Sequence, residues 1–171
     1  MARRIALILA SAALGAGALS ACGDDDKTGS EQLELTAKTG ERVSAGAKTG
    51  ALRLVDAAPM SYGELTGSAM MTRSESGTTL RVQVSGLEPG TRLAGHVHEK
   101  PCAQDEGGDH YQFLRGGAEE PPNEIHVKLV AGKGGAATAT ASTPQIAGLL
   151  ALSLVVHDAI RGGKVACADL A

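Results

Sequence analysis

The chain has 171 residues, enough for one ordinary domain and a further segment at one end. Apolar residues make up 43% of the chain and charged residues 20%, which excludes a chain that is disordered throughout. The formal net charge is −3, from 16 basic and 19 acidic side chains, and no basic stripe with interleaved aromatic residues occurs, which argues against a nucleic-acid partner.

The first 21 residues have the pattern of an export signal. Arg3 and Arg4 precede an apolar stretch, residues 5–19, that is too short to span a bilayer comfortably. The stretch ends in Leu19-Ser20-Ala21-Cys22, which resembles a bacterial lipobox, where the Cys is acylated and becomes the first residue of the mature chain. An ordinary signal peptide cut near Ala21 and a plain membrane anchor are the alternatives. The pattern predicts a lipoprotein anchored through Cys22 on the extracytoplasmic side of a membrane, in the periplasm or at the cell surface.

Export also decides how the three cysteines are interpreted. An extracytoplasmic compartment is oxidising and permits disulfides. If Cys22 is lipidated, Cys102 and Cys167 remain, and two cysteines in an exported domain most simply pair.

Residues 22–50 have the composition of a flexible tether. They are polar and rich in Gly, Ser and Thr, they begin near three consecutive Asp, and they show no apolar period. A short helix over residues 31–38 is the alternative, but it would have little to pack on. The expected organisation is therefore a signal peptide at 1–21, a tether at 22–50 and a folded domain at 51–171.

From residue 51 onward, short strands alternate with Gly and Pro turns. Between residues 80 and 85 apolar and polar side chains alternate strictly, which is typical of a strand with one buried face. The chain has no Trp and only two Tyr and one Phe, so its core has to be built mainly from aliphatic side chains. An aliphatic core suits one sheet packed on another. Strands are expected at residues 52–57, 65–71, 80–85, 92–99, 124–130, 137–141, 151–158 and 164–169. Eight such strands predict an all-β fold, an antiparallel Greek-key β-sandwich or barrel.

Histidines supply the candidate functional residues. His96 and His98 stand at positions i and i+2 of a predicted strand, so both point to the same face. His157 ends another apolar strand, and His110 lies in the segment 100–123, which is too long for a hairpin turn. Four neutral imidazoles with no thiolate pair nearby suit Cu(II), with zinc as the second choice. A surface pair at 96 and 98 with no ligand role is the alternative.

Several short motifs follow one another along residues 52–171. They are Gly86-Leu87-Glu88-Pro89-Gly90, His96-Val97-His98-Glu99, Cys102, Gly107-Gly108-Asp109-His110, Leu154-Val155-Val156-His157 and Ala166-Cys167. In this order they resemble the Cu/Zn superoxide dismutase family. The resemblance implies that His96, His98, His110 and His157 are copper ligands. It also implies that Cys102 and Cys167 form the intrasubunit disulfide.

One departure from the family concerns zinc. In the family the loop histidine bridges copper to zinc, and two further histidines and an aspartate complete the zinc site. Here only His126 stands between His110 and His157, and no Asp follows it. We therefore expect the zinc site to be lost and copper to be the cofactor. The alternative is a zinc site made by His126 with Asp109, Glu119, Glu120 or Glu124.

A second departure concerns the short segment between His157 and Cys167. Lys164 stands where the family has an arginine that positions the anion above copper. Lysine keeps the charge but lacks the planar fork of arginine, and Arg161 could substitute from the turn. We expect Lys164 and Arg161 to act in catalysis with His110; the alternative is that both are solvated turn charges. The two departures together are similar to the copper-only branch of the family.

The resemblance implies dismutation of superoxide anion to O2 and hydrogen peroxide outside the cell membrane, with His110 leaving Cu(I) to carry a proton. The alternative is a dismutase-like protein that binds or delivers copper with little turnover, and the third possibility is a purely structural domain on a lipid tether. Because the mature chain is acidic, attraction of superoxide has to come from copper, Lys164 and Arg161, so we expect rates that fall with added salt. The sequence carries no signal for an oligomeric state.

Overall fold

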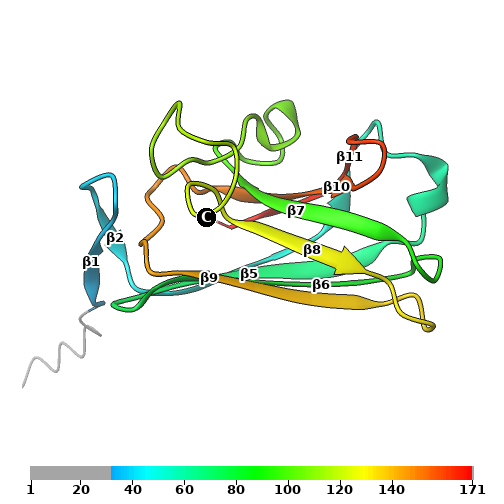
Figure 1. The fold of residues 1–171 in the computed structure, drawn as a ribbon, viewed down its shortest axis with the longest axis horizontal. Coiled ribbons are helices and arrows are strands. Elements are labelled where there is room, and N and C mark those ends of the chain that lie inside the picture. Colours follow the sequence, from blue (N-terminus) through cyan, green and yellow to red (C-terminus); the bar gives the residue numbers. More distant parts are fainter. Residues whose placement is uncertain (1–31, 171) are drawn as a thin grey trace, which may run out of the picture. The chain divides into compact units, whose positions relative to one another are not determined.

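The computed structural model describes residues 32–170, which are organised almost entirely as β-strands (Figure 1). The predicted signal peptide, and Cys22 with it, lie outside the described residues. Within the described range no helix is long and apolar enough to cross a membrane.

Between residues 32 and 170, eleven strands form three antiparallel sheets. The three sheets are a two-stranded hairpin of β1 and β2, a five-stranded sheet of order β4-β11-β10-β7-β8 and a four-stranded sheet of order β3-β5-β6-β9. The elements are β1 (Glu34–Thr36), β2 (Arg42–Ser44), β3 (Gly46–Ala51), β4 (Arg53–Leu54), the short 3-10 helix η1 (Met60–Tyr62), β5 (Thr66–Ser74), β6 (Gly77–Ser85), β7 (Arg92–His98), the 3-10 turn η2 (Asp105–Gly107), β8 (His126–Val130), β9 (Ala137–Thr143), β10 (Ser153–Asp158) and β11 (Lys164–Asp169).

The two larger sheets pack face to face and enclose an aliphatic core (Figure 1). Leu80 and Val82 of β6 are fully buried, whereas Arg81 between them is exposed, as the alternation in the sequence predicts. Leu93 of β7 and Leu154 of β10 close the core from the other sheet. Because successive side chains of a strand point to opposite faces, the same strands are free to present polar side chains on their other face.

The predicted all-β fold is confirmed, with two corrections. Each of the eight predicted segments contains a strand, although residues 52–57 supply only the two residues of β4, and three additional strands bring the total to eleven. The barrel is wrong, because the two larger sheets keep separate edges, β4 and β8 in one and β3 and β9 in the other. The molecule is an open sandwich.

The additional strands β1 and β2, and all of β3 except Ala51, lie in the stretch 22–50 that the sequence predicts to be a flexible tether. Within the described residues the folded unit begins at residue 32 rather than at 51. β3 pairs with β5 along its whole length, and the β1–β2 hairpin buries Leu35 and Val43 against Ile146. β3 has no apolar period because it is an edge strand with mostly exposed side chains, defined by its backbone hydrogen bonds.

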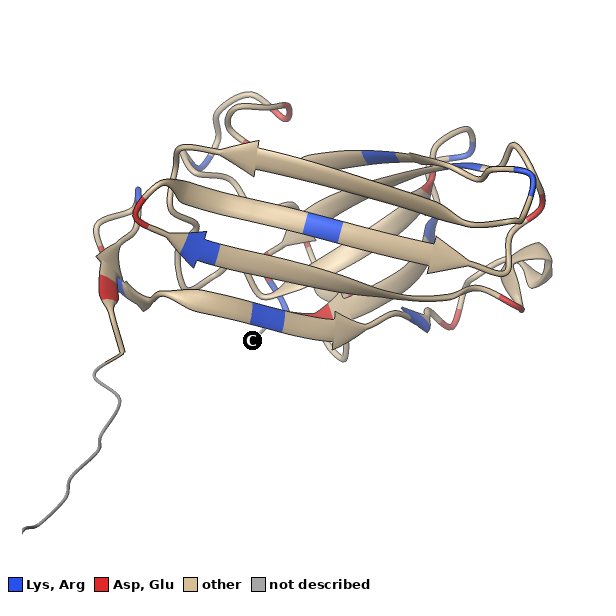
Figure 2. Cartoon of the chain, turned by 90° about the horizontal axis from the view of Figure 1, so that it is seen from below, with Lys and Arg blue, Asp and Glu red and all other residues tan. Residues whose placement is uncertain are grey.

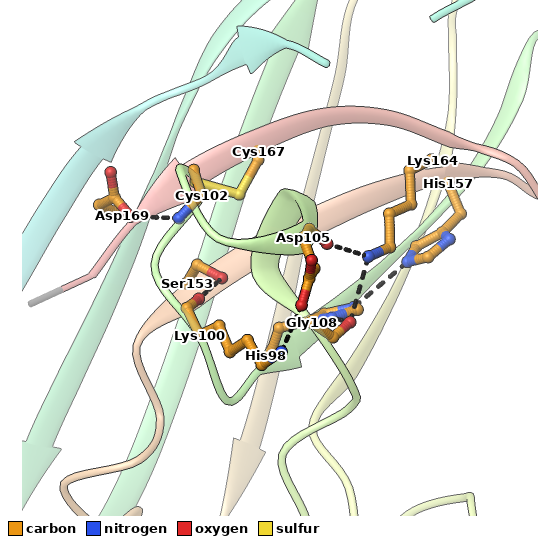
Figure 3. The surroundings of a disulfide bond; sticks show 10 residues. All are labelled: His98, Lys100, Cys102, Asp105, Gly108, Ser153, His157, Lys164, Cys167 and Asp169. Carbon is orange, nitrogen blue, oxygen red and sulfur yellow. Dashed lines mark hydrogen bonds and ion pairs between the residues drawn. A yellow bond between two sulfur atoms is a disulfide. The ribbon is translucent and has the colours of Figure 1, made fainter. Parts of the chain in front are cut away.

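The connection from β7 to β8, residues 99–125, carries η2 and a disulfide bond (Figure 3). The predicted pairing of Cys102 with Cys167 is confirmed. It fastens the start of this connection to β11. The backbone N–H of Cys102 also donates to Asp169 Oδ1 at 2.8 Å, and Ser153 Oγ donates to the Lys100 carbonyl at 2.7 Å. The connection is thereby held against the five-stranded sheet.

Candidate metal centre

Four histidines from three segments of the chain converge on one point. His96 and His98 come from β7, His157 from the neighbouring β10, and His110 from the connection between β7 and β8. One ring nitrogen of each lies within 4.8 Å of the others. His110 reaches them through a β-bridge between its backbone and that of His98. The structure thus brings together the four histidines that the sequence singles out.

Two glycines let the connection approach β7 this closely. Gly107 and Gly108 both have positive φ, 95° and 68°. A Cβ at Gly107 would lie 2.6 Å from Val155 Cγ2 and 2.9 Å from Ser153 Oγ. Residues with side chains cannot take this path, which explains why a Gly-Gly pair precedes His110.

Backbone carbonyls fix the protonation of two of the rings. His98 Nδ1 donates to the Gly108 carbonyl at 2.9 Å (Figure 3). His157 Nδ1 lies 3.4 Å from the Gly162 carbonyl. Because a carbonyl only accepts hydrogen bonds, each ring carries its proton on Nδ1 and leaves Nε2 without one. His98 Nε2 and His157 Nε2 lie 3.3 Å apart. Two unprotonated nitrogens repel each other at this distance unless a cation lies between them.

Burial keeps these rings neutral. It lowers the pKa of His96 to about 3, and the neighbouring rings add to the effect. It also lowers the pKa of His98 to about 3, and the pKa of His157 is lowered chiefly by burial as well. Neutral imidazoles with free lone pairs are metal ligands, so the set is ready to bind a metal ion at neutral pH.

A buried carboxylate orients His110. The side chain of Glu124 is 1% exposed, and its Oε2 accepts hydrogen bonds from His110 Nδ1 at 2.8 Å and from His126 Nε2 at 2.7 Å. Its Oε1 accepts from Gln112 Nε2 at 2.9 Å. Burial raises the pKa of Glu124, but these three hydrogen bonds outweigh it and lower the pKa. An ionised Glu124 holds the proton of His110 on Nδ1 and leaves Nε2 facing the other rings.

From the sequence, Glu124 is expected only as an alternative zinc ligand. Its orientation of His110 is not predicted. A carboxylate fourteen residues from a histidine carries no sequence signal. It is the β-bridge at His110 and the start of β8 that put the two side chains together.

A second group of possible metal ligands shares His110 with the first. His110, Glu124 and His126 have ligand atoms within 4.8 Å of one another. His126 faces His96 across the β7–β8 ladder, with ring centroids 4.2 Å apart. Among the residues described, the other sequence-based candidates for a zinc site, Asp109, Glu119 and Glu120, are not members of this group.

Lys164 lies beside the four histidines. Its Nζ donates to the carbonyls of Asp105 at 2.8 Å and Gly108 at 3.1 Å, so the Gly108 carbonyl receives hydrogen bonds from both Lys164 and His98 (Figure 3). Lys164 lines the same hollow as His98, His110 and His157, which has a volume of about 540 Å³.

Arg161 is placed elsewhere. Its side chain is 74% exposed, its Nη1 lies 3.3 Å from Asp158 Oδ2, and it lines a separate hollow beside Tyr62. The structure therefore brings Lys164, but not Arg161, together with the histidines.

Comparison with known proteins gives one kind of match. No protein-family model matches the sequence, and no curated protein does. Among solved structures, the chain is similar to a Cu/Zn superoxide dismutase from Brucella abortus, with a TM-score of 0.50 and 21% sequence identity over 73% of this chain and 99% of that one. At this identity the match shows a shared fold.

Proposed function

We propose that this protein is a copper-dependent superoxide dismutase, acting outside the cytoplasm as a lipoprotein anchored through Cys22. The observation that carries the proposal is the convergence of four histidines whose ligand atoms lie within 4.8 Å of one another, with His98 Nε2 and His157 Nε2 3.3 Å apart. The fold shared with the Brucella abortus enzyme supports the reaction, and the N-terminal sequence pattern supports the location.

The donor set fits copper. All four donors are imidazole nitrogens, a set that suits Cu(II), which prefers tetragonal nitrogen ligation and binds more tightly than other divalent first-row ions. When bound, copper would supply the one-electron chemistry that oxidises one superoxide to O2 and reduces a second, with two protons, to hydrogen peroxide.

His110 is the residue placed to move a proton. Its side chain is 31% exposed, whereas His98 is 1% exposed, so His110 is the more accessible to solvent of the two. Glu124 keeps the Nδ1 proton in place, and therefore Nε2 is the atom that can take up a proton and give it to substrate. Glu124 acts through His110 and is a positioning residue.

Lys164 contributes positive charge at the substrate side of the centre. An ammonium group has three N–H donors, and the carbonyls of Asp105 and Gly108 use two of them. The third remains for an anionic substrate. Arg161 has no part in this proposal, because it lines a different hollow.

Copper alone is the proposed cofactor. The second group offers only three donors, and in it the two rings already donate to the same Glu124 oxygen. Zinc would have to displace both protons.

The test combines metal content with dismutase activity on the full chain, loaded with copper alone and then with copper and zinc. One copper per chain with high activity, unchanged by zinc, supports the proposal. A His98→Ala variant should lose copper and activity, and a Glu88→Gln variant, at an exposed residue of the separate hollow beside Tyr62, is the control that keeps both. Stoichiometric copper without activity would favour the copper-binding or delivery alternative, and no stoichiometric copper would overturn both.

A further inference from the structure

Charged side chains line the hollow onto which His98, His110 and His157 open, and most of them are acidic. Four carboxylates and two basic side chains line the hollow, so its formal charge is −2 with the histidines neutral. The residues are Glu99, Asp109, Glu119 and Glu124 on the acidic side, and Arg115 and Lys164 on the basic side.

Both cations of the hollow are already engaged. Arg115 Nη2 lies 3.0 and 2.8 Å from the two carboxylate oxygens of Glu99, and Lys164 donates to two backbone carbonyls. In contrast, Asp109 and Glu119 are exposed and form no ion pair with any residue that the structure describes. Arg115 is neutralised by Glu99, whereas Lys164 keeps its positive charge because its acceptors are neutral carbonyls. Asp109 and Glu119 therefore add two exposed negative charges, which with the buried Glu124 outweigh Lys164.

Charged residues outside the hollow do not reverse its negative net charge. Lys100, a cation outside the hollow whose charge interacts with that of Asp109, is paired with Asp105. The charged residues of the four-stranded sheet are all basic, Lys48, Arg73 and Arg81, but they lie in the other layer of the sandwich, and acidic residues are found mostly in the loops (Figure 2).

We propose that the net charge of the entrance favours uptake of the metal cation and gives no net long-range attraction to superoxide, with Asp109 and Glu119 as the residues that set this preference. A divalent ion approaching the empty centre meets a formal charge of −2, which speeds its association. Once Cu(II) is bound the sum is zero, and with Cu(I) it is −1, so an anion approaches an entrance without net positive charge. The statement about superoxide rests on the proposed function; the statement about copper uptake does not.

The charges of the hollow differ from those that the sequence predicts around the site. Attraction by Lys164 and Arg161 predicts rates that fall with added salt. Arg161 lies outside the hollow. Inside it, the positive charge of Lys164 stands against three carboxylates that have no Lys or Arg partner among the described residues, Asp109, Glu119 and Glu124. We now expect the superoxide rate constant to stay constant or rise with ionic strength.

The first experiment measures copper association with the metal-free full chain by stopped flow, following the absorbance of the copper–histidine complex. The association rate constant should fall as ionic strength rises from about 0.01 M to about 0.15 M, because the Debye length shortens from about 30 Å to about 8 Å. The double variant Asp109→Asn/Glu119→Gln should bind copper about two- to tenfold more slowly at low salt. Glu88→Gln is the matched control, because Glu88 is an exposed carboxylate that lines the separate hollow beside Tyr62.

High salt separates an electrostatic effect from damage to the site. At about 1 M salt the Debye length is about 3 Å, so the wild type and the double variant should bind copper at the same rate. A variant that stays slow at high salt has an altered ligand set, and that result would overturn the assignment of Asp109 and Glu119 as purely electrostatic residues.

The second experiment measures kcat/KM for superoxide on the copper-loaded proteins over the same salt range. The double variant should be faster than the wild type at low salt, by about two- to tenfold, and should slow with added salt. The two substitutions thus act in opposite directions on copper uptake and on superoxide turnover.

Two results would overturn the inference: a copper association rate that neither salt nor the double substitution changes, or a wild-type superoxide rate that falls steeply with salt. Failure of the proposed function is distinguishable from either. A protein that binds copper without dismutase activity would refute the dismutase, and the copper association data would still decide the role of Asp109 and Glu119.

Discussion

His98 Nε2 and His157 Nε2 face each other at 3.3 Å, and each ring has its other nitrogen directed at a backbone carbonyl. The two residues are 59 positions apart, and they meet because β7 and β10 are neighbouring strands. Neither ring can direct its N–H at the other ring without losing the contact of that N–H with the backbone carbonyl. A cation bound between the two nitrogens would relieve the repulsion between their lone pairs.

Copper should therefore stabilise the fold. At a free copper concentration of about one hundred times Kd, the free energy of unfolding should rise by about 2.7 kcal/mol, because a ligand that binds only the native state adds RT ln(1 + [L]/Kd). Thermal unfolding with and without copper measures the shift. A His157→Ala variant should show a smaller shift. An equal shift in that variant would mean that copper binds elsewhere.

Replacing Glu124 with Gln should weaken the fold and disturb His110. The substitution keeps the size of the side chain but removes the charge that accepts hydrogen bonds from two rings, and hydrogen bonds to charged groups contribute about 1.5–3 kcal/mol each. We expect the metal-free protein to lose about 2–3 kcal/mol of unfolding free energy in urea titrations. We also expect an altered electron paramagnetic resonance spectrum of the copper-loaded protein.

Glu120→Gln is the control for that experiment, since Glu120 is exposed and outside the group of His110, Glu124 and His126. If both variants gave the wild-type spectrum, Glu124 would not be positioning His110.

Acid should destabilise the metal-free protein well before its carboxylates titrate. His96 and His98 have pKa values of about 3 in the fold against 6.5 ordinarily. Between these values the unfolded chain binds protons that the folded chain does not, so the free energy of unfolding falls as pH falls below about 6.5. At about pH 5.5 each of these two rings should lower the free energy of unfolding by about 1.4 kcal/mol.

Urea titrations of the metal-free protein between about pH 7.5 and about pH 5.0 measure this loss. In a His98→Gln variant the side chain does not titrate, so the loss should be smaller. A pH dependence identical to that of the wild type would contradict the burial effect on His98.

How far the sequence predicts this molecule depends on whether a feature is local. The i, i+2 spacing of His96 and His98 fixes a shared face, and apolar periodicity locates the strands that carry His98 and His157. Glu124 escapes prediction, because its partnership with His110 is made by a long connection whose path only the packed structure defines. The position of Arg161 also depends on folding. Asp158 Oδ1 accepts hydrogen bonds from the backbone N–H groups of Ile160 and Arg161, and in this turn Arg161 lines a hollow separate from that of the histidines.

The same Asp158 supplies a test that separates stability from metal binding. Tyr62 in η1 donates from its hydroxyl to Asp158 Oδ2 at 2.9 Å, and both residues are buried. Burial, and then this hydrogen bond, raises the pKa of Tyr62 to about 12, so the hydroxyl keeps its proton and remains a donor over the physiological range. A Tyr62→Phe variant leaves the buried carboxylate with one hydrogen bond fewer and should lose about 1–2 kcal/mol of unfolding free energy.

Copper stoichiometry should not change in this variant, because Tyr62 lines a hollow separate from that of the four histidines. Ser61→Ala is the control, since Ser61 is exposed and neighbours Tyr62 in η1. A Tyr62→Phe protein that unfolds like the wild type but binds less copper would show that this hydrogen bond serves His157, the residue next to Asp158, rather than the packing of η1 on the sandwich.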